Sequence, residues 1–261
     1  MNASEAQPAG RPPSTMVSTD ASVDPREVAL FGGIAHEWWD PNGTSKLLHR
    51  INPVRLAYIR AHALDRFGRD ERARSPFGDL RALDVGCGGG LLCEPLTRMG
   101  FAVTGLDAAP ENIAVAQAHA AAMGLSIDYR AGSAEALADE RPGSFDLITC
   151  LEVVEHVADV DSFLSALSHL LAPGGLLIFS TPNRTPQSYA VMIVGAERVL
   201  RSIPEGAHDW DKFLTPEELT SALAAAGLKV THSSGLNYSL SRGFTLSRDM
   251  SVNYIGTAVH A

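Results

Sequence analysis

Three side chains able to carry protons or bind metal ions stand within five residues of one another. They are Glu152, Glu155 and His156, in the segment CLEVVEHV that ends a buried apolar stretch. Two carboxylates and an imidazole can bind a divalent cation such as Mg²⁺, Mn²⁺ or Zn²⁺. The same groups can act without a metal, because histidine titrates near neutral pH and serves as a general base. A metal-bound imidazole nitrogen accepts no proton, so the two roles of His156 exclude each other and the residues alone leave both open.

A glycine-rich segment, LDVGCGGG at residues 83–90, is the second candidate site. Gly86, Gly88 and Gly90 follow a run typical of a strand and precede a run typical of a helix. Because glycine lacks a Cβ atom, a ligand can approach the backbone of such a loop closely. Asp107 ends the next strand, where a carboxylate can accept hydrogen bonds from both hydroxyls of a ribose. The pair of features predicts a nucleoside-binding site.

The glycine spacing indicates which nucleoside ligand this site binds. The dinucleotide fingerprint is G-x-G-x-x-G, whereas this chain has G-x-G-x-G. A pyrophosphate also needs free amide groups and would be repelled by Asp84 within the motif. A carboxylate there suits a cation such as the sulfonium of S-adenosylmethionine. The residues therefore favour S-adenosylmethionine over a dinucleotide.

The elements around these residues follow an alternating pattern. After residue 80, short apolar runs typical of strands alternate with helical runs, which predicts an α/β fold with a doubly wound, Rossmann-like and mostly parallel sheet of about seven strands. Thr215, Pro216 and Glu218 form a helix-capping signal. We expect a disordered tail at 1–24 and one domain at 25–261, in which 25–67 form a helical lid and 182–214 an insertion after the fifth strand.

Composition limits the function classes. The chain has 261 residues, and 21 Lys and Arg against 30 Asp and Glu give a net charge of 21 − 30 = −9, which excludes general nucleic-acid binding. It has no apolar run of 18 residues, so we expect no transmembrane helix. The start lacks the apolar region of a signal peptide, and the cysteines include no CxxC pair. We therefore expect a cytoplasmic protein without disulfides or structural zinc.

Several segments together resemble a known family. LDVGCGGG, the acid at Asp107, FDLI and LAPGGLLIFSTPN resemble class I S-adenosylmethionine-dependent methyltransferases over about residues 80–182. HEWWDPNGTSKLLHRINPVRLAYI, TCLEVVEHV, FSTPNRTPQSYAVMIVGAERVLRSIPEGAHDWDKFLTPEEL and VNYI resemble, more narrowly, the ubiquinone-biosynthesis O-methyltransferases over about residues 25–256. The resemblance implies methyl transfer to phenolic hydroxyls of polyprenylated ubiquinone precursors, namely 2-polyprenyl-6-hydroxyphenol and 3-demethylubiquinol.

The resemblance also implies roles for single residues. Arg55, in the INPxR segment, would contact the methionyl carboxylate, and Leu151 would lie beside the cofactor. Together with the loop and its acids, the expected cofactor-binding residues are Arg55, Asp84, Gly86, Gly88, Asp107 and Leu151. The catalytic residues would be Glu152, Glu155 and His156, and the same three would bind a divalent cation, usually Mg²⁺. A dication bound to catechol-like oxygens would stabilise the phenolate.

The insertion suggests how an insoluble prenyl substrate is reached. Residues 187–203 are mostly apolar, and Arg184, Arg198 and Arg201 against Glu197 give a local charge of 3 − 1 = +2. An apolar helix face flanked by basic residues is typical of helices that lie on anionic membranes. We therefore expect peripheral association with the inner face of the membrane, beside other enzymes of ubiquinone biosynthesis. Weaker candidates for substrate contact within the insertion are His208, Asp209 and Lys212.

Two other functions are compatible with the sequence. One is an N- or C-methyltransferase of a soluble metabolite, which would not need the apolar insertion. The other is a lipid-binding subunit that keeps a degenerate cofactor pocket and has no activity. The intact glycines and Asp107 argue against the second function, and binding of S-adenosylmethionine would test it directly.

Overall fold

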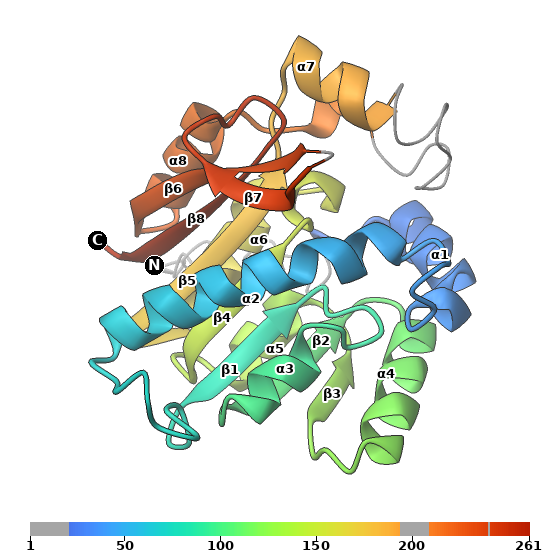
Figure 1. The fold of residues 1–261 in the computed structure, drawn as a ribbon. Coiled ribbons are helices and arrows are strands. Elements are labelled where there is room, and N and C mark those ends of the chain that lie inside the picture. The colour runs from blue at the N-terminus through green and yellow to red at the C-terminus, as the bar shows by residue number, and fades with distance from the viewer. Residues whose placement is uncertain (1–20, 194–208, 240) are drawn as a thin grey trace, which may run out of the picture.

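Residues 21–193, 209–239 and 241–261 are described by the computed structural model of this chain, and within them eight strands form one sheet. The strand order is β3-β2-β1-β4-β5-β8-β6-β7 (Figure 1). The strands are β1 (Arg81–Val85), β2 (Ala102–Asp107), β3 (Asp128–Ala131), β4 (Phe145–Leu151), β5 (Leu171–Pro182), β6 (Leu228–Ser239), β7 (Gly243–Ser247) and β8 (Asn253–His260).

The helices connect and cover these strands. The α-helices are α1 (Pro25–Gly33), α2 (Lys46–Arg66), α3 (Cys93–Arg98), α4 (Pro110–Ala122), α5 (Ala134–Glu140), α6 (Val160–Leu170), α7 (Pro186–Ser188) and α8 (Pro216–Ala225). Short 3-10 helices are η1 (Ala35–Glu37), η2 (Val154–His156) and η4 (Trp210–Lys212). The predicted capping box is present at α8, where the Thr215 hydroxyl accepts from the Glu218 amide and the Glu218 carboxylate accepts from the Thr215 amide.

The sheet confirms the predicted α/β class. Strand β1 pairs in parallel with both β2 and β4, so the chain order reverses at β1 and leaves a crevice at the carboxyl ends of these strands. Strand β8 lies antiparallel between β5 and β6. The sheet has eight strands where about seven were predicted, because β6 continues past β8 and turns back as the short strand β7. Strand β7 is only five residues long and mostly half-buried, so this edge hairpin gives little signal in the sequence.

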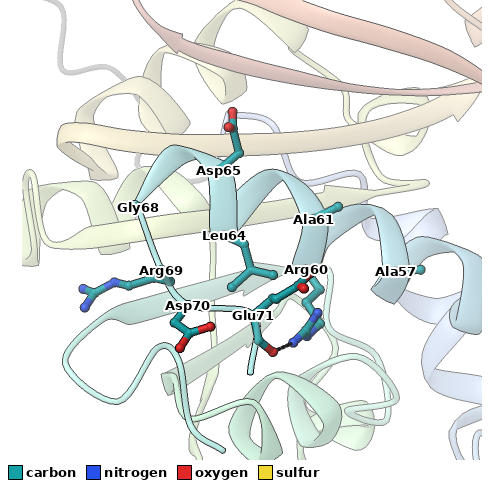
Figure 2. Close-up of a pocket in the computed structure, with 9 residues that line it drawn as sticks. All are labelled: Ala57, Arg60, Ala61, Leu64, Asp65, Gly68, Arg69, Asp70 and Glu71. Atoms are coloured by element: carbon teal, nitrogen blue, oxygen red, sulfur yellow. Dashed lines mark hydrogen bonds between the residues drawn. The ribbon is translucent and has the colours of Figure 1, made fainter. Parts of the chain in front are cut away.

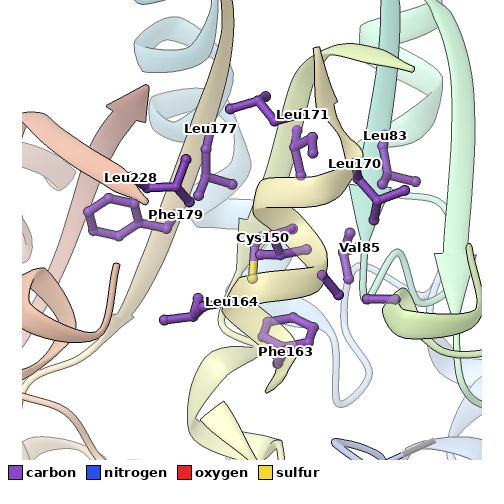
Figure 3. Packing of buried hydrophobic residues seen from close by; sticks show 14 of the residues in the cluster. Leu83, Val85, Cys150, Phe163, Leu164, Leu170, Leu171, Leu177, Phe179 and Leu228 are labelled. Carbon is purple, nitrogen blue, oxygen red and sulfur yellow. The ribbon is translucent and has the colours of Figure 1, made fainter. Parts of the chain in front are cut away.

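Apolar side chains pack on both faces of the sheet. One cluster joins the strands to α2, α3 and α4, and the other joins them to α5, α6 and α8. Figure 3 shows the second cluster, in which Phe163 and Leu164 of α6 face Cys150 of β4 and Leu177 and Phe179 of β5 are drawn nearby. Cys150 is 2% exposed and lies two residues before Glu152. The core therefore holds the end of β4 rigidly.

Helix α2 crosses one face of the sheet as a long rod, and its first half reaches the active-site edge (Figure 1). Its second half and the connection at 68–71 line an open pocket of about 760 Å³ (Figure 2). That pocket contains none of the predicted site residues. In the part of the chain that the structure describes, every helix is too short or too polar to cross a bilayer.

Candidate active site

The glycine loop leaves β1 and turns against the end of β2. The amides of Gly86 and Cys87 donate to the carbonyl oxygen of Leu106 at 2.8 and 3.0 Å. Gly86 and Gly88 have φ values of 69° and 52°, which favour glycine. A Cβ atom at Gly86 would lie 2.4 Å from Cγ2 of Val153, so the segment after β4 packs directly on this loop. The loop is thus closely packed beside the predicted catalytic residues.

Asp107 lies where the sequence predicts a ribose-binding acid, at the end of β2. Its Oδ2 accepts a hydrogen bond from the amide of Gly88 at 2.8 Å. Its Oδ1 accepts from the amide of Ala109 and from Nδ2 of Asn112, at 2.9 and 3.0 Å. These bonds fix the carboxylate beside the glycine loop, which is the geometry that a ribose-binding acid requires.

Asp84 lies inside the protein under the loop, only 4% exposed. Its carboxylate accepts hydrogen bonds from the Thr149 hydroxyl at 2.7 Å and from the Cys93 thiol at 3.3 Å. Burial raises the pKa of Asp84 to about 6, although these hydrogen bonds and the charge of Arg55 oppose the shift. A nearby cation would stabilise its ionised form. This agrees with the expected preference for a sulfonium.

Arg55 and Leu151 come from two different elements, α2 and β4. Arg55 is 3% exposed on α2, and its Nη2 lies 2.7 Å from Oε1 of Glu152. Its Nε is buried and has no hydrogen-bond partner among the described residues. Leu151 is half-buried at the last position of β4, as predicted. A buried guanidinium with an unused donor suits a carboxylate ligand.

Glu152 follows β4 in a left-handed conformation, with φ 57°. Its Oε1 accepts from Arg55 and from the Ser180 hydroxyl at 2.6 Å, and its Oε2 accepts from Nδ2 of Asn253 at 2.7 Å. The side chain therefore faces α2, β5 and β8. Its oxygens make no hydrogen bond with Glu155 or His156, the other two predicted catalytic residues.

Glu155 and His156 form a separate pair on η2. Oε2 of Glu155 accepts from the Thr181 hydroxyl at 2.9 Å, while its Oε1 is buried without a hydrogen bond and lies 3.9 Å from Nε2 of His156. Burial raises the pKa of Glu155 to about 7, against the opposing charge of His156. Burial lowers the pKa of His156, but a hydrogen bond with Glu27 and the charge of Glu155 raise it above 6.5.

The predicted three-ligand metal site does not fit this arrangement. Within the described ranges, no three His, Cys, Asp or Glu side chains are placed to hold an ion. The physical reason is the direction of Glu152, whose two oxygens are taken by Arg55, Ser180 and Asn253. Of the three predicted ligands, only Glu155 and His156 have donor atoms that face each other.

Comparison with known proteins gives the family. A family model described as a methyltransferase domain matches residues 48–233. A ubiquinone biosynthesis O-methyltransferase of a Chelativorans species is 52% identical over 235 residues, covering 90% of this chain and 92% of that protein. One of Cereibacter sphaeroides is 51% identical over 247 residues, covering 93% and 99%. The chain belongs to the ubiquinone biosynthesis O-methyltransferase family.

Solved structures agree with the fold of this family. An S-adenosylmethionine-dependent methyltransferase of Thermotoga maritima, described as a possible histamine N-methyltransferase, aligns with a TM-score of 0.58 at 14% identity, covering 89% of this chain and 99% of that one. A putative methyltransferase of Haloferax volcanii aligns with a TM-score of 0.55 at 16% identity, covering 88% and 97%. At such identities the likeness shows the fold alone, which is that of an S-adenosylmethionine-dependent methyltransferase.

The amino-terminal segment supplies residues to the site that sequence reasoning did not select. Trp38 lies on the glycine loop, where a Cβ atom at Gly88 would be 2.5 Å from its ring, and its Nε1 donates to Oδ1 of Asn112 at 2.8 Å. Trp39 donates to the carbonyl oxygen of Gly89 at 2.9 Å. The apolar pattern of this segment predicts a lid, but nothing in it identifies the loop as the surface it covers.

The residues predicted in the insertion differ in where they lie and in which partners they have. Nζ of Lys212 lies 3.3 Å from Oδ2 of Asp24 and 3.5 Å from Oε1 of Glu27. Asp209 caps η4, and His208 falls outside the described residues. Arg184 is paired with Glu218 and donates to the carbonyl oxygen of Phe213 at 3.1 Å. Lys212 therefore ties the lid helix to the insertion, while Arg184 has internal partners.

Proposed function

We propose that this protein transfers a methyl group from S-adenosylmethionine to a phenolic hydroxyl of polyprenylated ubiquinone precursors, 2-polyprenyl-6-hydroxyphenol and 3-demethylubiquinol. The observation that carries the proposal is the packing of Val153 on Gly86, because it sets His156 beside the expected cofactor loop. The names of relatives about half identical to this chain support the same reaction.

Bound S-adenosylmethionine supplies the electrophilic methyl group and leaves as S-adenosylhomocysteine. The phenolic oxygen must lose its proton as it attacks, since a phenol has a pKa near 10. His156 is the proposed proton acceptor through Nε2, because its Nδ1 lies 3.2 Å from Oε2 of Glu27. That contact places a proton on Nδ1 in the neutral ring and leaves the lone pair on Nε2. Asp84 favours the positive sulfonium electrostatically, and Asp107 holds the ribose.

Binding of a divalent cation remains a prediction. Two protein residues are available to bind the cation, rather than the three that the sequence suggested. Oε1 of Glu155 and Nε2 of His156 are the donors that fit, in which case His156 is not the base, and Glu152 is excluded by its partners. A cation there would lower the pKa of a bound phenol. Methyl transfer by metal-stripped protein, with and without EDTA and with Mg²⁺ added back, tests the requirement. Full activity in EDTA would leave His156 as the base.

We also propose that the insertion docks on an anionic membrane at its cytoplasmic face. Tyr189 and Val191 are 41% and 52% exposed, which supports an apolar contact surface. Ile193, which belongs to the same predicted apolar segment, is instead 7% exposed. The rest of the predicted segment, from residue 194, lies outside the described residues. Binding to anionic vesicles that exceeds binding to neutral vesicles and falls with salt is expected. No binding to either vesicle would overturn docking.

A substrate comparison tests the proposed reaction against its rivals. The protein is incubated with S-adenosylmethionine and either a short-chain prenylated catechol or unprenylated catechol. The proposal expects a higher kcat/KM for the prenylated substrate. Equal rates would favour a methyltransferase of soluble metabolites, and cofactor binding without turnover of either substrate would favour a non-catalytic subunit.

A further inference from the structure

The backbone conformation of Glu152 and its side-chain contacts together fix the direction in which its carboxylate points. A non-glycine residue in the left-handed region is sterically unfavourable and persists only where its surroundings fix it. Here φ is 57°, and the Glu152 amide donates to the carbonyl oxygen of Ser180 at 2.9 Å. The backbone turns the carboxylate away from Glu155 and toward Arg55.

Three elements place donors around that carboxylate. Arg55 comes from α2, Ser180 from β5 and Asn253 from the start of β8, at 2.7, 2.6 and 2.7 Å. Each oxygen therefore already accepts at least one hydrogen bond, and one of the donors carries a full positive charge. A metal ion at Glu152 would have to share the carboxylate with these donors and lie next to a guanidinium. This site favours an ion pair over a metal.

One nitrogen of the Arg55 guanidinium is hydrogen-bonded to Glu152, and another has no partner among the described residues. Its Nη2 is bound to Glu152, whereas its Nε is buried without a partner in the described part of the chain. Its partner Glu152 directly precedes Val153, which packs on Gly86, so the guanidinium lies near the expected cofactor loop. A buried donor that lacks an acceptor predicts a ligand atom there. The methionyl carboxylate of the cofactor is an acceptor of the right charge.

We propose that Glu152 is a positioning residue that holds Arg55 for the carboxylate of the cofactor, and is not a metal ligand. The inference deepens the proposed function and rests on its cofactor. The guanidinium is planar, so fixing Nη2 also fixes the direction of Nε. Glu152 thereby acts on cofactor binding through Arg55, without touching the methyl group or the phenol.

Calorimetry with two ligands tests this role. S-adenosylhomocysteine has the amino-acid end, and 5′-methylthioadenosine keeps the nucleoside and sulfur but lacks that end. Variants E152Q, E152A, R55A and R55A/E152A are compared with the wild type. E217Q is the control, because Glu217 lies on the exposed face of α8, away from Arg55 and the glycine loop. Circular dichroism and melting curves monitor folding, and E152Q keeps the shape of the side chain if E152A does not fold.

We expect E152Q to bind S-adenosylhomocysteine at least about tenfold more weakly and to bind 5′-methylthioadenosine within twofold of the wild type. E217Q should bind both ligands normally, and R55A/E152A should be no weaker than R55A. Unchanged affinity of E152Q for S-adenosylhomocysteine would overturn the proposal. So would loss in E152Q of Mn²⁺ binding, measured by electron paramagnetic resonance, with cofactor affinity intact. Neither ligand needs a methyl acceptor, so the result is independent of whether a phenol is methylated.

Discussion

Oε2 of Glu27 lies 3.2 Å from Nδ1 of His156, and this contact joins the lid helix α1 to the end of β4. The ring of Phe31, one turn further along α1, contacts the His156 ring edge-on at 5.1 Å. Oε1 of Glu27 also lies 3.5 Å from Nζ of Lys212. The proposed base is therefore oriented by a helix that precedes the nucleotide-binding part of the chain.

Substitution of this carboxylate should change both rate and pH dependence. Glu27→Gln should lower kcat about tenfold, because the imidazole loses a partner that fixes its tautomer. Glu27 raises the pKa of His156, so its removal lowers that pKa. The rate rises with pH as His156 loses its proton, and that rise should move to lower pH in the variant. Glu217→Gln, on the exposed face of α8, is the control. An unmoved pH profile would argue against His156 as the base.

Asp107→Ala should weaken S-adenosylmethionine binding at least about tenfold, since charge-assisted hydrogen bonds to the ribose are lost. The variant also frees the amide of Gly88 from its bond to Oδ2. Calorimetry measures the affinity, and the melting temperature shows whether the protein remains folded. Normal affinity in a folded variant would refute the assignment of Asp107 to the ribose.

Asp84 should make cofactor affinity depend on pH. The sulfonium of S-adenosylmethionine is absent from S-adenosylhomocysteine, so their affinity ratio isolates its charge. Because the pKa of Asp84 is about 6 without ligand, the acid is ionised above this pH and attracts the cation. The ratio should fall as the pH drops from 7.5 to 5. Asp84→Asn should lower the ratio about tenfold at pH 7.5 and remove its pH dependence. A ratio unaffected by the substitution would contradict the role.

Trp38 should report cofactor binding directly. Its ring covers Gly88 and Gly89, and its indole donates to Asn112, which in turn donates to Asp107. Binding of S-adenosylmethionine should change tryptophan fluorescence, and Trp38→Phe should remove most of that change and weaken binding several-fold. Trp210→Phe is the control, because Trp210 bonds Thr185 in another region. A change that survives in Trp38→Phe would place the lid response elsewhere.

Local signals made much of this site predictable. The glycine loop, Asp84 and Asp107 depend on strand ends and on neighbouring residues, and the structure places them together as expected. The direction of Glu152 depends instead on Arg55, Ser180 and Asn253, which come from three distant segments. Spacing within CLEVVEHV suggested one cluster, but a left-handed residue split it in two. The periodicity of apolar residues along the sequence gives no signal for such a turn.

The contacts of the lid could not be predicted from the neighbouring sequence either. Glu27 reads as an ordinary exposed acid in the first turn of a helix, yet His156 and Lys212 are its partners. The edge strand β7 is short and half-exposed, which explains why seven strands were predicted and eight are found. The capping box at Thr215, by contrast, depends on four successive residues and was predicted correctly.

The most direct test of the proposed reaction locates the transferred methyl group. The wild-type protein is incubated with S-adenosylmethionine carrying a trideuterated methyl group and with a short-chain analogue of 3-demethylubiquinol. Mass spectrometry and nuclear magnetic resonance of the product should show one trideuteromethyl group on the phenolic oxygen, and His156→Ala should reduce its formation at least about a hundredfold. A methyl group on carbon, or no methylated product from protein that binds the cofactor, would contradict the proposed O-methyltransferase.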